Sequence, residues 1–232
     1  LVYNLKYIRI NLDFKKLIGF FLVGLFFLYF SNILNAKSSF VFPYSEKLSF
    51  LVLRNAKPFG YHEIIFDKKE NGEIHVNISI ELKVKLGFIT LFNYEHKNIE
   101  IWKENKLQSI KTRTNDNGKM FMVDAKKTDN GLEVKTNNNN TIYPGEIYPT
   151  SYWYKPSLKT GKMLDTQRGI LVDIEVTPGE LEKLKLEDGT IEAKKYIITK
   201  DLNLFVWYTE KNQLVRIAFN ARGSEIDYII KE

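Results

Sequence analysis

The sequence predicts an all-β protein made of a single curved antiparallel sheet, as a meander, half-barrel or barrel-like structure, with one long central loop and at most one short helix. Residues 74–88 alternate strictly between apolar and polar side chains, which is typical of a strand with one buried and one wet face. Hairpin turns are indicated by four Asx-Gly pairs: Asn71-Gly72, Asn117-Gly118, Asn130-Gly131 and Asp188-Gly189. Both central residues of a type I′ turn need positive φ, which these pairs tolerate.

The predicted strands follow one another closely, as in a meander. They cover residues 48–54, 61–66, 73–88, 89–96, 99–103, 107–114, 119–126, 132–136, 170–177, 190–199, 203–208, 213–220 and 224–230. Strand 73–88 would be about 45 Å long at about 3.3 Å per residue, which suits a strongly curved sheet or a barrel wall. Residues 179–187 fit a strand or a helical turn, and residues 157–167 fit the short helix.

A long loop at residues 137–168 interrupts the strands, and loops of this length are usually functional or disordered. Its stretch "EIYPTSYWYKPS" is stiff, because Pro149 and Pro156 restrict the residues before them to extended conformations. We expect Tyr152 and Trp153 to cover the open end of the sheet. They would form either a lid over a ligand or a plug over a packed core.

The N-terminal region predicts export. Two lysines precede an uninterrupted apolar stretch at residues 17–30, and a more polar segment ends at Ala36, as in a secretory signal peptide. Residues 17–36 would also be just long enough for an uncleaved membrane anchor. Both readings place one β domain, residues 37–232, in the periplasm or otherwise outside the cytoplasm of a bacterium.

Charge and composition argue against a nucleic-acid partner. The formal net charge is +6, and residues 1–36 hold four cations and one anion, which leaves +3 for the remainder. No basic run is interleaved with aromatic residues, as a nucleic-acid surface would require.

No catalytic residue, metal site or cofactor is predicted. The three histidines are His62, His75 and His96, and we expect surface or cross-strand polar roles for them, because adjacent strand residues point to opposite faces. Ser151 lies in no recognisable nucleophile motif, and there is no glycine-rich phosphate loop. An enzyme is therefore uncertain, and an unrecognised hydrolase is the third hypothesis.

Five segments, in this order, carry a resemblance to a known family: "LVLRNAKPFGYHEIIF", "YEHKNIEIWKENKLQSIKTRTNDNGK", "PTSYW", "LDTQRG" and "LFVWYTEKNQLVRIAF". The sequence resembles the exported bacterial family catalogued as domain of unknown function 6134, over nearly all of the chain after residue 36. The resemblance implies no activity. More distantly, the expected architecture is similar to the curved sheets of periplasmic lipoprotein-localisation carriers, which hold acyl chains on the concave face.

A sheet with one apolar face and little helix must either close on itself or enclose something apolar. Our first hypothesis is therefore a non-enzymatic module that binds a lipid or other hydrophobic ligand in an apolar cavity. The alternative is a structural or interaction module of the cell envelope with a protein partner and no small ligand. The candidate ligand-binding residues are Phe88, Phe92, Tyr94, Tyr148, Tyr152 and Trp153.

Overall fold

A computed structural model describes residues 42–86 and 88–231. The predicted signal peptide or anchor, residues 1–36, lies outside the described residues. Within the described ranges, no helix combines the length and apolar character needed to cross a membrane.

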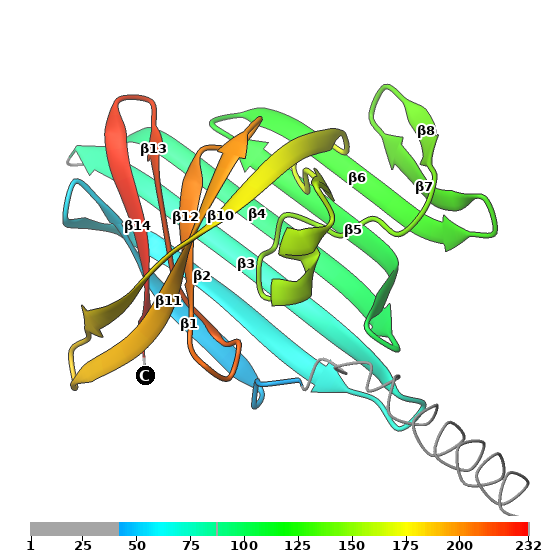
Figure 1. The fold of residues 1–232 in the computed structure, drawn as a ribbon. Coiled ribbons are helices and arrows are strands. Elements are labelled where there is room, and N and C mark those ends of the chain that lie inside the picture. Colours follow the sequence, from blue (N-terminus) through cyan, green and yellow to red (C-terminus); the bar gives the residue numbers. More distant parts are fainter. Residues whose placement is uncertain (1–41, 87, 232) are drawn as a thin grey trace, which may run out of the picture. The chain divides into compact units, whose positions relative to one another are not determined.

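The described chain forms one 14-stranded antiparallel sheet, which confirms the predicted fold class (Figure 1). Its strands are β1 (Lys47–Arg54), β2 (Lys57–Lys68), β3 (Glu73–Leu86), β4 (Ile89–Lys103), β5 (Lys106–Asp116), β6 (Lys119–Thr128), β7 (Gly131–Thr136), β8 (Asn140–Tyr143), β9 (Lys162–Leu164), β10 (Leu171–Lys185), β11 (Thr190–Lys200), β12 (Leu204–Tyr208), β13 (Leu214–Ala221) and β14 (Ser224–Lys231). Consecutive strands are neighbours except β8 and β9, which are the two edges. The first and last strands, β1 and β14, pair in the middle of the sheet.

All four Asx-Gly pairs lie at hairpin turns, but the predicted turn type is wrong for three of them. Only Asn117-Gly118 has positive φ at both residues, 52° and 94°. The same double positive φ occurs at three two-residue turns without an Asx-Gly pair: Asn55-Ala56, Glu104-Asn105 and Arg222-Gly223. Tight turns are therefore more numerous than the Asx-Gly signal indicates.

The structure lacks two of the predicted breaks between strands, and it contains two short strands that the sequence analysis did not predict. Residues 89–103 form one strand, β4, because Asn98 is buried while Lys97 faces out, so the alternation continues through both polar residues. Residues 179–187 extend β10 up to Lys185 and contain no helical turn. The edge strands β8 and β9 were not predicted, and the short helix is one 3₁₀ turn, η1 (Lys155–Lys159).

The connection between β8 and β9, residues 144–161, lies across the curved sheet (Figure 1). It contacts strands that are distant in the sheet order. The Trp153 indole donates a hydrogen bond to Glu100 in β4, and the Tyr208 hydroxyl in β12 donates one to the Tyr152 carbonyl. We call the sheet face that this connection contacts the inner face, and most of the buried core lies there.

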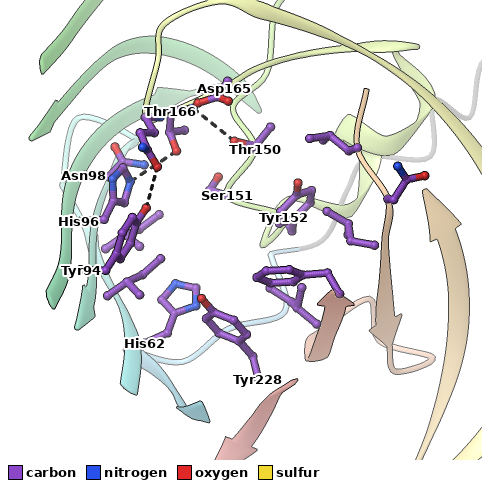
Figure 2. A pocket seen from close by; sticks show the side chains of 18 of the residues that line it. His62, Tyr94, His96, Asn98, Thr150, Ser151, Tyr152, Asp165, Thr166 and Tyr228 are labelled. Carbon is purple, nitrogen blue, oxygen red and sulfur yellow. Dashed lines mark hydrogen bonds between the residues drawn. The ribbon is translucent and has the colours of Figure 1, made fainter. Parts of the chain in front are cut away.

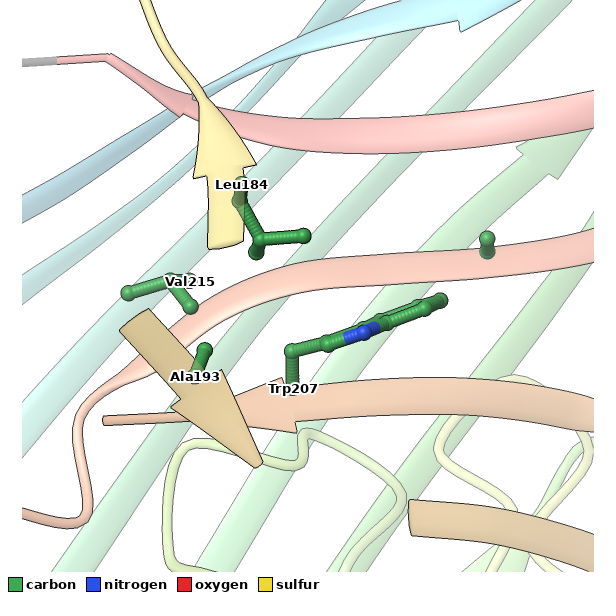
Figure 3. Packing of buried hydrophobic residues seen from close by; sticks show 5 residues of the cluster. Leu184, Ala193, Trp207 and Val215 are labelled. Atoms are coloured by element: carbon green, nitrogen blue, oxygen red, sulfur yellow. The ribbon is translucent and has the colours of Figure 1, made fainter. Parts of the chain in front are cut away.

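A second, smaller core lies around Trp207 (Figure 3). Leu184 and Ala193, from the β10–β11 hairpin, pack there with Val215 and Ala218 of β13. The Trp207 Nε1 donates to Glu182 at 2.7 Å. Trp207 thus holds the long hairpin against the sheet.

Candidate functional site

The inner face contains a cavity of about 430 Å³, here called the inner chamber. Side chains from β2 and β4 enter it on one side, and Tyr152 enters from the long connection (Figure 2). Its apolar walls include Ile78, Ile80 and Ile217, and its polar lining includes His62, Tyr94, His96, Asn98 and Tyr228. A volume of this size is within the range of small-molecule sites, about 300 to 1,000 Å³.

Strand β4 places an unusual row of polar side chains on the inner face. The alternating residues are Tyr94, His96, Asn98, Glu100 and Trp102, and the last four of these are buried. On the same strand the apolar Ile99 is 49% exposed. On this part of β4 polar side chains are buried and an apolar one is exposed, the reverse of the usual pattern. Buried polar groups need hydrogen-bond partners, so this row of residues is a candidate site.

The sheet register brings two histidines to the same cavity. His62 in β2 is paired with Ile80 in β3, and Ile80 is paired with His96 in β4. The two histidines are thus two strands apart, about 10 Å at the usual strand spacing of about 4.8 Å. Both are 4% exposed, so neither has a surface role, and His96 has the other expected role, a cross-strand polar contact with its β5 partner Thr114. His75 is partly exposed, with its Nε2 3.1 Å from Glu73.

His62 is a buried imidazole without a hydrogen bond. Neither of its ring nitrogens has a partner among residues 42–86 and 88–231. Its ring stacks on Phe50 at 5.3 Å between centroids and meets the edge of Tyr228 at 5.6 Å. Burial lowers the pKa of His62 to about 3, with His96 as a second cause. The ring is therefore neutral at physiological pH, with one donor and one acceptor nitrogen, and both nitrogens are buried in the wall of the chamber.

His96 is also buried, but its nitrogens are engaged. Nδ1 lies 2.7 Å from the Thr114 hydroxyl, and Nε2 lies 3.4 Å from the Thr166 hydroxyl. Burial lowers the pKa of His96 to about 4, partly offset by Asp165. Next along the strand, Asn98 donates through Nδ2 to Glu100, and its Oδ1 has no partner in the described chain.

Glu100 anchors the long connection. This carboxylate is fully buried, and it accepts hydrogen bonds from Asn98 Nδ2 at 2.8 Å, Trp102 Nε1 at 2.8 Å and Trp153 Nε1 at 2.9 Å. Burial raises its pKa, and the indole and amide donors act in the opposite direction. Trp153 is 1% exposed and packs edge-on against Trp102 at 4.9 Å and Phe66 at 5.3 Å. We call Trp153 in this packing the plug, and whether it seals a packed core or covers a ligand stays a prediction.

Tyr152, beside the plug, lines the inner chamber. Its φ is +60°, which is uncommon for a residue with a side chain and costs conformational energy. The Tyr208 hydroxyl donates to the Tyr152 carbonyl at 2.6 Å and holds this conformation. The Glu100–Trp153 and Tyr208–Tyr152 bonds thus fix adjacent residues of the connection to opposite arms of the sheet.

The predicted ligand-binding residues lie in four different places. Tyr94 and Tyr152 line the inner chamber, and Phe92 and Tyr94 line a neighbouring cavity described below. Trp153 and Tyr148 pack on Trp102 instead. Phe88 is fully exposed at the β3–β4 turn and lines neither cavity.

The expectation for Phe88 assumed that the alternation runs through the turn without a bulge, and this is wrong. The register shifts between Val84 and Lys85. Sequence reasoning missed four inner-face residues: His62, His96, Asn98 and Glu100. The alternation from Tyr94 to Trp102 could have identified the three residues on β4. It was not recognised because the segment was interpreted as two strands.

A second cavity of about 380 Å³, the outer chamber, adjoins the first and shares Tyr94, Gln167, Phe219 and Tyr228 with it. Phe59 and Phe92 stack there at 5.7 Å. The Arg54 guanidinium lies 5.8 Å from the Phe59 ring centroid, and that of Arg222 lies 5.4 Å from the Phe92 centroid. The outer chamber therefore combines aromatic surface with positive charge.

Comparison with solved structures supports the fold. The crystal structure of a β-barrel-like protein of domain of unknown function DUF1849 from Brucella abortus matches with a TM-score of 0.57 and 9% identity, over 81% of this chain and 95% of that chain. At this identity the likeness shows the fold alone. The crystal structure of MucB in complex with MucA(peri) has 9% identity over 79% of this chain and 86% of that chain, and its TM-score of 0.15 carries no argument.

No curated protein matches the sequence significantly. The family described as "Domain of unknown function (DUF6134)" matches residues 50–231, which include nearly every strand and both chambers. That match covers well over half of the sequence. The chain therefore belongs to the DUF6134 family.

Proposed function

We propose that this protein is an exported, non-enzymatic module that binds a small amphiphile in the inner chamber. The observation that carries the proposal is His62, a buried imidazole with no hydrogen-bond partner in the described chain, facing a cavity of about 430 Å³. A buried polar group without a partner costs about 1–3 kcal/mol. A side chain that only filled the core would avoid this cost, whereas a ligand or water would supply the missing bond.

The lining suggests the chemistry of the ligand. Ile78, Ile80 and Ile217 offer apolar surface, and His62 and Asn98 place uncharged polar atoms without hydrogen-bond partners in the wall. A molecule with an apolar body and a hydroxyl or amide group would satisfy both features. Apolar walls with a few placed polar groups are the usual composition of small-molecule sites.

The same residues give little support to hydrolysis. The hydroxyl nearest to His96 Nδ1 is that of Thr114, which is fully buried and does not line the inner chamber. The buried Glu100 receives hydrogen bonds from two indoles and an amide. This arrangement favours binding over nucleophilic catalysis, which needs a nucleophile that a substrate can reach next to its base.

The competing function is a structural or interaction module whose chamber holds only water, which a polar cavity of this size could accommodate. Organic-solvent extraction of the purified protein, followed by mass spectrometry, separates the two. We expect a reproducible amphiphile from the wild type. Recovery from His62→Phe should fall about five- to tenfold, which corresponds to the loss of one hydrogen bond.

The matched control is His75→Gln, because His75 is partly exposed and outside both chambers. It should retain the wild-type amount of ligand. His62→Phe should also be as stable as the wild type or more stable, because the unpaired nitrogens are removed. Wild-type protein that repeatedly yields no bound molecule would contradict the proposal.

A further inference from the structure

We infer that the ligand carries an anionic group, a carboxylate or a phosphate, and that Arg54 binds this group in the outer chamber. The inference rests on the proposed function. It adds the charge of the ligand and its orientation, with the anionic end in the outer chamber and the apolar body directed toward the inner chamber.

The two chambers are adjacent enough for one ligand to contact both. Four residues line both cavities, and two of them, Tyr94 and Tyr228, also help to enclose His62 and His96. A molecule with its hydrogen-bonding group at His62 would therefore extend past Tyr94 toward the stacked rings of Phe59 and Phe92.

The charged side chains of the outer chamber do not balance. They are Arg54, Arg222 and Asp116. Arg222 donates through Nη2 to both Asp116 oxygens, at 3.0 and 2.8 Å, so these two neutralise each other. Arg54 has no ion pair within the described ranges, which leaves one positive charge in an aromatic surrounding.

Arg54 is held in place but has unused donors. Its Nε donates to the Ser224 hydroxyl at 2.9 Å, and its guanidinium lies against Phe59. The two terminal nitrogens have no partner among the described residues. A guanidinium presents such donors as a planar fork that fits carboxylate and phosphate oxygens, and contact with an aromatic face pre-organises it.

Isothermal titration calorimetry with three ten-carbon probes tests the inference: decanoate, decyl phosphate and 1-decanol. We expect the wild type to bind at least one of the two anions about tenfold or more tightly than the alcohol, as a charged hydrogen bond predicts. Arg54→Gln should abolish this preference and leave binding of 1-decanol unchanged. Arg54→Lys should retain part of it, because it keeps the charge without the fork.

Arg113→Gln is the matched control, because Arg113 is an exposed β5 arginine that lines neither chamber. It should bind like the wild type. Equal binding of all three probes, or an unchanged preference in both Arg54 variants, would overturn the inference and leave the proposed function standing. Failure of all three probes to bind would overturn the inference, and solvent extraction without a ligand would overturn the proposed function as well. The preferred anion identifies the head group as carboxylate or phosphate.

Discussion

Among single residues, His62 and Glu100 are both buried polar groups, but they differ in whether they have hydrogen-bond partners. Glu100 receives three hydrogen bonds from side chains that lie beside it, while His62 receives none from the described chain. A fully satisfied group of this kind stabilises one arrangement of the interior. An unsatisfied one reduces stability unless a bound molecule or water supplies the missing hydrogen bond.

The two buried histidines predict acid destabilisation. Their pKa values in the folded protein are about 3 for His62 and about 4 for His96, against 6.5 for an ordinary histidine. Above pH 6.5 both histidines are neutral in the folded and in the unfolded chain. Their contribution to the free energy of unfolding is then fully present. Below that pH the unfolded chain gains protons that the folded chain does not, so stability falls by up to about 1.4 kcal/mol per pH unit for each histidine.

Urea unfolding at several values between pH 7 and pH 5 measures this slope. His62→Phe should lower the slope by about the contribution of one histidine, about 1.4 kcal/mol per pH unit at most. Carboxylates titrate equally in both proteins, so the difference between them isolates His62. Identical slopes for the two proteins would show that His62 has the same pKa in the folded and unfolded states, contrary to our account.

The Glu100–Trp153 contact predicts that the plug contributes strongly to stability. Trp153→Ala should lower the free energy of unfolding by about 3–5 kcal/mol, as for other buried aromatic residues. Glu100→Gln should cost about 2 kcal/mol, because its amide would face donors that need an acceptor. Chemical denaturation measures both.

Glu95→Gln is the control for this prediction. Glu95 lies on the same strand, its side chain is 41% exposed, and it pairs with Lys83 at 3.5 Å. Exposed pairs contribute about 1 kcal/mol at most. If Glu100→Gln were no more destabilising than Glu95→Gln, the buried carboxylate would not hold the plug.

Among the elements, β2 and β3 approach unusually closely at Gly60, beside the register shift between Val52 and Leu53 of β1. A Cβ at Gly60 would lie 1.9 Å from the Glu81 carbonyl oxygen, a backbone atom that cannot rotate away. Gly60→Ala should therefore destabilise the protein by about 2–3 kcal/mol, the upper part of the overpacking range.

Gly72→Ala separates steric crowding from backbone strain. Gly72 has a φ of +80° and no atom within 4 Å of an added Cβ, so only the left-handed conformation opposes alanine, at about 1–2 kcal/mol. Thermal unfolding of both variants tests the comparison. A Gly60→Ala protein as stable as the wild type would mean that β2 and β3 are further apart.

Local signals predicted most of the sheet. Strict alternation identified β3, and Asx-Gly pairs identified four hairpins, because both depend on neighbouring residues. The continuity of β4 was missed, since its inner face is polar and the pattern is therefore inverted. The pairing of β1 with β14 joins segments at opposite ends of the domain, and no local pattern encodes it.

The site was predicted only in part for the same reason. Phe92, Tyr94 and Tyr152 stood out as aromatic residues, and they line the chambers. His62 was expected to have a surface or cross-strand polar role, because only the register of three strands brings it level with His96. Glu100 looked like one carboxylate among many until the long connection placed Trp153 against it.

For the whole molecule, we predict that the mature chain begins near Lys37. The polar segment that ends at Ala36 motivates this expectation, which lies outside the described residues. Intact-mass measurement of the native protein after cell-envelope fractionation checks it. Retention of residues 17–36 in a membrane pellet would favour the anchor instead.

The central claim is that the curved sheet encloses a ligand. The most direct test is a crystal structure of the protein purified without detergent or organic solvent. We predict continuous non-protein density in the inner chamber, within hydrogen-bond distance of His62 and the Asn98 Oδ1, and extending past Tyr94 toward Arg54. Density that resolves only into separate water molecules hydrogen-bonded to His62 and Asn98 would contradict the claim.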